Sequence, residues 1–148
     1  MNNILITACD FESAGEMGRM IGPMVQKPFW VPICQSLSKI QEKYLEAKER
    51  GIQFDIIFNG VSSLNASQKI IKKCLECEDA ELGYQSIKIA VLAPKLSYIM
   101  ENPRVNPVLY NEIQQFLKDN FDGNFITSPL IKWELRDLLK KCGIKIRT

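Results

Sequence analysis

The chain contains no histidine. Histidine is the usual general base of Ser-His-Asp triads and Cys-His dyads, and it is the commonest metal ligand in proteins. Its absence excludes triads, Cys-His dyads, histidine zinc sites and phosphohistidine chemistry from what this chain can do alone. Any catalytic hypothesis must therefore use other side chains.

Long apolar runs and one-sided charge are also missing. Nineteen lysines and arginines stand against seventeen aspartates and glutamates, and no stretch concentrates one sign. This balance predicts neither a nucleic-acid stripe nor a patch for anionic membranes. No run approaches the roughly 20 apolar residues of a membrane span, and residues 1–8 lack the basic region and apolar core of a signal peptide. We therefore expect a cytoplasmic protein with no direct membrane insertion and no nucleic-acid partner.

The five cysteines are odd in number and irregularly spaced, which indicates reduced thiols rather than a disulfide framework. Cys74 and Cys77 form a C-x-x-C pair inside a run with helical spacing. The pair has no second ligand pair and no histidine to complete a tetrahedral zinc site. We expect neither a metal nor another cofactor.

The 148 residues, of which 46% are hydrophobic, are enough for one α/β domain spanning 1–148. Periodicity predicts strands at 4–6, 52–58, 87–93, 125–126 and 144–147. It predicts helices at 33–50, from 65 to about 77, from 107, and from 128 to a stop at Gly143, with a helical turn at 96–100. Asn59-Gly60 is interpreted as the turn after the second strand, Asn65 and Ser128 as helix caps, and Trp133 as a core residue. Prolines at 23, 28 and 32 indicate an irregular insertion.

Alternating strands and helices predict a parallel sheet covered by helices on both faces, a three-layer α/β domain. Five such strands commonly take the order 2-1-3-4-5, and a ligand crevice then lies beyond the carboxyl ends of strands one and three. The loops expected there are residues 9–15, 59–63 and 94–98.

Cys9 directly follows the first strand and precedes a turn into a helix. Backbone N–H groups and the positive end of a helix dipole favour the thiolate form of a cysteine in such a place. Ser13, Gly15 and Gly18 could let the backbone wrap an anion such as phosphate, and Ser62 and Ser63 offer hydroxyl groups. A buried, inert Cys9 is the competing interpretation. Three acids in the same loop, Asp10, Glu12 and Glu16, oppose phosphate binding, and the C-x5-R and P-loop signatures are absent.

Two segments resemble a known family. The run Ile-Leu-Ile-Thr-Ala-Cys at 4–9 and the run Val-Leu-Ala-Pro-Lys-Leu-Ser-Tyr-Ile-Met-Glu at 91–101 are similar to segments of lactose/cellobiose-type enzyme IIB components of the sugar phosphotransferase system. Those segments are the first strand with its cysteine and the third-strand L-x-P-Q-x-x-Y-x motif. The sequence departs from the family where acids replace the small hydroxyl residues of its C-x-x-G-M-S-T-S loop, and where Lys95 replaces glutamine.

The resemblance implies a flavodoxin-like fold in which Cys9 accepts a phosphoryl group from a phosphohistidine on a protein donor. The group then passes to a sugar bound by a membrane sugar permease, so the chain would be a phosphotransferase component. The residues nominated for ligand binding are Asp10, Ser13, Gly15, Gly18, Asn59, Ser62, Pro94, Lys95 and Tyr98.

Two other functions remain open. A non-catalytic flavodoxin-like module could bind a nucleotide, a flavin or a protein partner at the same crevice, with Tyr98 and Tyr110 stacking on a ring. A small transferase or hydrolase could use Asp10, Glu12 or Glu16 as acid or base. The sequence leaves open whether the domain is an enzyme at all.

Overall fold

A computed structural model describes residues 3–7, 11–24, 33–34, 37–78 and 83–144. Strands and helices alternate along the chain, as predicted. The strands are β1 (Ile4–Thr7), β2 (Ile33–Cys34), β3 (Ile56–Val61), β4 (Ile87–Leu92) and β5 (Phe125–Ile126). The helices are α1 (Phe11–Ile21), α2 (Leu37–Glu49), α3 (Leu64–Leu75), α4 (Pro94–Glu101), α5 (Pro107–Phe121) and α6 (Lys132–Lys141).

The strands form a sheet in the order β2-β1-β3-β4-β5, and every neighbouring pair is parallel. Leu5 pairs with Ile57, and Phe58 pairs with Ile89. Helical crossovers return the chain to the same edge of the sheet before each new strand, which makes consecutive strands parallel. The predicted α/β class with a parallel sheet is confirmed.

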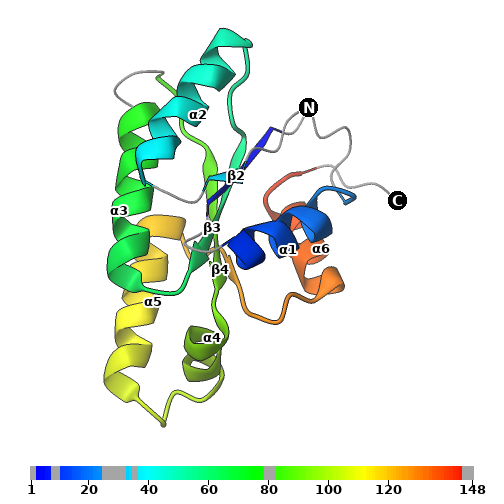
Figure 1. Ribbon diagram of the computed structural model, residues 1–148. Helices are drawn as coiled ribbons and strands as arrows, with labels where there is room; N and C mark the ends of the chain where they lie inside the picture. Colours follow the sequence, from blue (N-terminus) through cyan, green and yellow to red (C-terminus); the bar gives the residue numbers. More distant parts are fainter. Residues whose placement is uncertain (1–2, 8–10, 25–32, 35–36, 79–82, 145–148) are drawn as a thin grey trace.

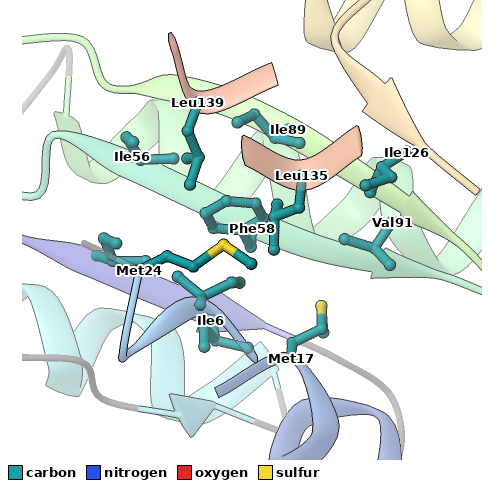
Figure 2. Packing of buried hydrophobic residues seen from close by; sticks show 12 residues of the cluster. Ile6, Met17, Met24, Ile56, Phe58, Ile89, Val91, Ile126, Leu135 and Leu139 are labelled. Carbon is teal, nitrogen blue, oxygen red and sulfur yellow. The ribbon is translucent and has the colours of Figure 1, made fainter. Parts of the chain in front are cut away.

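Helices cover both faces of the sheet (Figure 1), with α2, α3 and α5 on one side of the strands and α1 and α6 on the other. Alternate strand residues therefore enter two different cores. Ile6 and Phe58 pack with residues of α1 and α6 (Figure 2), whereas Leu5 and Ile57 pack with α2 and α3. Burial on both faces explains why the central strands are almost continuously apolar.

The helix ends follow from local sequence signals. The Asn106 side chain accepts a hydrogen bond from the backbone N–H of Leu109 at 3.1 Å, and Pro107 occupies the first turn of α5. Asp122 ends that helix with a φ of 51°, in the left-handed region. Gly51 ends α2 with a φ of 69°, which glycine adopts without steric cost.

One predicted helix begins later than expected, and an unpredicted strand precedes it. Residues 33–34 form β2 and pair with β1, so that α2 starts at Leu37. This pairing satisfies backbone groups of β1 that an open edge would leave without partners. The predicted order placed residues 87–93 beside the first strand. In the structure, β2 and β3 occupy the two sides of β1, and residues 87–92 pair with β3 and β5 instead. Ile144 lies outside any strand, and the rest of the expected strand at 144–147 lies outside the described residues, as does most of the insertion at 23–32.

Three expected boundaries are wrong. Asn59-Gly60 lies inside β3 rather than in a turn, and Ser63 rather than Asn65 caps α3 by accepting a hydrogen bond from the backbone N–H of Ala66. Helix α6 begins at Lys132, because the Ser128 hydroxyl donates instead to the carbonyl of Leu92 at 2.6 Å.

Trp133 is exposed, contrary to the prediction that it lies in the core. Its exposed fraction is 64%. Leu135 and Leu139 are the buried residues of α6, one helical turn apart, and Trp133 lies about half a turn away from Leu135 around the helix axis. The apolar stripe of this helix is therefore narrower than its sequence indicates.

Candidate functional site

The carboxyl ends of β1, β3 and β4 meet at one edge of the sheet, toward α4 in Figure 1. Thr7 is paired with Asn59, and Val61 with Leu92. The backbone N–H of Ala93 donates to the carbonyl of Val61 at 2.8 Å, just past the last pair. Helix α1 leaves β1 toward one face of the sheet and α3 leaves β3 toward the other, which is the arrangement that opens a crevice in α/β folds.

Cys9 and Asp10, the leading candidates at this edge, lie outside the described residues. The elements that flank them are described. β1 ends at Thr7 and α1 begins at Phe11, so Cys9 is two residues before the first residue of a helix. Ser13 lies in the first turn of α1, and its side chain is also outside the description.

Gly15 and Gly18 do not form an anion-binding loop. Both lie within α1, where backbone N–H groups beyond the first turn bond to carbonyls of the same helix. The buried side chains of Met17 and Ile21 pack on the sheet, and this packing outweighs the cost of about 1 kcal/mol for each helical glycine. Within α1, this leaves the first-turn N–H groups for an anion at this edge.

Asn59 is a buried structural residue rather than part of a ligand-binding turn. Its side-chain amide donates to the Thr7 hydroxyl at 2.6 Å, and the Ser67 hydroxyl donates to its carbonyl oxygen. Thr7 in turn donates to the carbonyl of Phe58 at 3.4 Å. The amide thus ties the last residue of β1 to β3 and α3.

The remaining predicted residues lie at the exposed rim of the same edge. Ser62 is exposed just after β3, and Pro94 and Lys95 are exposed at the start of α4. Tyr98, one turn further along α4, has an exposed fraction of 53%. The structure therefore brings Ser62, Pro94 and Lys95 to the edge that carries the connection between β1 and α1.

Sequence reasoning missed two hydrogen-bonded serines, Ser97 in α4 and Ser128 before α6. The Ser97 and Ser128 hydroxyls both donate to the carbonyl of Leu92, at 3.1 and 2.6 Å. The backbone N–H of Ser128 donates to the Ser97 hydroxyl at 2.9 Å. These bonds hold the segment before α6 against the end of β4, and two serines 31 positions apart form no pattern that a single sequence reveals.

A buried ion pair at the opposite, amino edge of the sheet was also missed. The Lys88 ammonium lies 3.0 Å from the Glu78 carboxylate, with side-chain exposures of 7% and 0%. The same carboxylate accepts hydrogen bonds from the Tyr44 hydroxyl and from the backbone N–H and hydroxyl of Ser86. A lysine within the otherwise apolar run of β4 was the available signal, because a buried ammonium requires a buried partner.

The C-x-x-C cysteines lie beside this ion pair and are buried. Burial raises the pKa of the Cys74 thiol to about 12, although a hydrogen bond with Tyr44 acts in the opposite direction. Burial likewise raises the pKa of Tyr44 far above its ordinary value. Cys74 is therefore a protonated core thiol at neutral pH, unsuited to nucleophilic chemistry.

Within the ranges that the structure describes, no three histidine, cysteine, aspartate or glutamate side chains are grouped so that they could hold a metal ion. Of the helices in those ranges, none combines the length and apolar character that crossing a membrane requires.

Comparisons with known proteins add no family to this picture. No model of a protein family matches the chain, and a search of curated proteins returns no match.

Proposed function

We propose that the domain is a cytoplasmic phosphocarrier with a flavodoxin-like fold, similar to lactose/cellobiose-type enzyme IIB components. Cys9 accepts a phosphoryl group from a protein donor and passes it on to a sugar held by a membrane permease. The observation that carries the proposal is the position of Cys9 in the sequence, between a buried central strand and the first residue of α1. The carboxyl edge at which β1 ends is also where parallel α/β folds bind their ligands.

The electrostatics of this position support an anionic intermediate. The first four N–H groups of a helix have no partner within the helix, and the helix dipole adds positive potential there. Both favour the thiolate of a nearby cysteine and the negative charge of a phosphoryl group. Ser62 and Lys95 are exposed at the same edge, and they offer a hydroxyl and a cation to such a group.

The transfer proceeds in two displacements. The Cys9 thiolate attacks the phosphorus atom of the donor's phosphohistidine, an S–P bond forms, and the N–P bond breaks with its electron pair returning to the imidazole, which takes up a proton. A sugar hydroxyl oxygen then attacks phosphorus, and the S–P bond breaks to restore the thiolate. The hydroxyl proton leaves to solvent or to a base of the permease. Because the chain has no histidine, the donor histidine belongs to another protein.

Phosphoramidate, a small molecule with the N–P bond of phosphohistidine, tests the proposal. We expect the protein to gain the mass of one phosphoryl group, and peptide mapping to place it on Cys9. The Cys9→Ser variant is expected to gain none, whereas Cys142→Ser is expected to react like the unaltered chain. Transfer to no cysteine, or equal transfer to Cys142, would contradict the proposal.

A further inference from the structure

A hollow of about 540 Å³ lies at the amino edge of the sheet, opposite the edge assigned to Cys9. Asn3 precedes β1, Ile52 and Asp55 precede β3, and Lys48 lies in the last turn of α2. Tyr84 also lines the hollow. The volume falls within the range of roughly 300–1,000 Å³ that is typical of small-molecule sites.

One part of this wall suits a cation. The Asp55 carboxylate accepts a hydrogen bond from the backbone N–H of Asn3 at 2.8 Å, and a carboxylate can accept several more. The carboxyl end of α2, with its partial negative charge, borders the same hollow.

Another part of the wall suits an anion. Tyr84 accepts a hydrogen bond from the backbone N–H of Phe54 at 3.1 Å, which leaves its own hydroxyl proton to donate. Burial raises the pKa of Tyr84 to about 12, against the hydrogen bond from Phe54, so the hydroxyl keeps this proton at neutral pH. Lys48 is exposed, and it belongs to none of the ion pairs found between the described residues.

We propose that this hollow binds a free α-amino acid as its zwitterion. Asp55 receives the ammonium group, Lys48 and the Tyr84 hydroxyl receive the carboxylate, and Ile52 with the Tyr84 ring contacts an apolar side chain. A phosphate would meet the repulsion of Asp55, and a simple amine would leave Lys48 and Tyr84 without a ligand acceptor. The site shares no residue with the Cys9 edge and does not depend on the proposed phosphoryl transfer.

Calorimetric titration of the full chain with L-phenylalanine and L-leucine tests this site. Phenethylamine, which lacks the carboxylate, and 3-phenylpropanoate, which lacks the ammonium group, are the matched controls for phenylalanine. We expect one of the amino acids to bind in the millimolar range or tighter, and each truncated analogue of phenylalanine to bind about tenfold more weakly than phenylalanine itself, as expected when a charged hydrogen-bonding group is lost. No binding by either amino acid, or equal binding by the analogues, overturns the proposal.

Variants of the wall locate the binding. Lys48→Met and Asp55→Asn are each expected to weaken amino-acid binding about tenfold. Lys72→Met, which removes an exposed lysine from α3, is the charge-matched control and is expected to leave the affinity unchanged. Lys48 is exposed, so its replacement does not endanger folding even if Asp55→Asn does. An unchanged affinity in Lys48→Met overturns the assignment. Adenine serves as an uncharged planar probe, and tighter binding of adenine than of either amino acid would also overturn it.

Discussion

Replacing Glu78 with glutamine is expected to lower the free energy of unfolding by about 3–5 kcal/mol, the usual cost of removing one member of a buried ion pair. Glutamine keeps the shape of the side chain and can still bond to Tyr44 and Ser86. It leaves the Lys88 ammonium buried without a negative partner, however, and this uncompensated charge is the source of the loss.

Denaturant unfolding measures this effect. The dependence of the unfolding free energy on denaturant concentration is compared between variants. Glu76→Gln is the matched control, because Glu76 lies two residues before Glu78 at the end of α3 and forms a surface pair with Lys73 at 4.0 Å. Exposed pairs contribute about 0–1 kcal/mol. Adding Lys88→Met to Glu78→Gln removes the unpaired ammonium charge. The double variant is expected to recover most of the lost unfolding free energy. A loss below 1 kcal/mol in Glu78→Gln would show that the pair is not buried as described.

Phe58→Ala is expected to cost about 3–5 kcal/mol of unfolding free energy. Phe58 has an exposed fraction of 0% and belongs to the cluster that joins the sheet to α1 and α6, with Met24 and Leu135 among its members (Figure 2). Truncation leaves a cavity between two layers that cannot collapse freely, because rigid strands hold one wall.

Trp133→Ala provides the contrast to Phe58→Ala. Trp133 is the larger side chain, but it is mostly exposed, so we expect its removal to change the unfolding free energy by no more than about 0.5 kcal/mol. Chemical denaturation of both variants decides between the two assignments of core residues. A larger cost for Trp133 than for Phe58 would favour the core predicted from sequence periodicity.

The alternation of strands and helices was predictable because buried apolar residues recur in the sequence with the period of a helix or a strand. The apolar run of β4 and the spacing of Ile40, Tyr44 and Ala47 in α2 indicate their elements directly. Local signals also placed Pro107 at the start of α5 and Asp122 near its end. These features depend on neighbours in sequence, which one sequence supplies.

Features that depend on distant partners were missed or misassigned. β2 is two residues long, and only the open edge of β1 makes it a strand. Gly15 and Gly18 lie in a helix because Met17 and Ile21 have a sheet to pack against. Trp133 is exposed because the core of α6 is already filled by Leu135 and Leu139.

In the candidate site, too, some features depend on sequence neighbours and others on distant partners. Sequence reasoning predicted which strand ends gather at one edge of the sheet, because parallel topology determines this; that the edge holds the site stays a prediction. It misassigned Asn59, whose role follows from its pairing with Thr7, 52 positions away in sequence, and not from the Asn-Gly pattern. It also missed Ser97 and Ser128, which contact each other only after β4, α4 and β5 have assembled.

The rate at which iodoacetamide labels Cys9 across pH tests the central claim most directly. Peptide mapping resolves each cysteine, and Cys142 serves as the internal reference because burial raises the pKa of its thiol, despite the opposing effect of Lys141. A thiolate stabilised at the start of α1 is expected to react well below the free-thiol pKa of about 8.5, at a pH at which Cys142 is still unreactive. Labelling of Cys9 that rises only above that pH, in parallel with Cys142, would contradict a phosphocarrier cysteine.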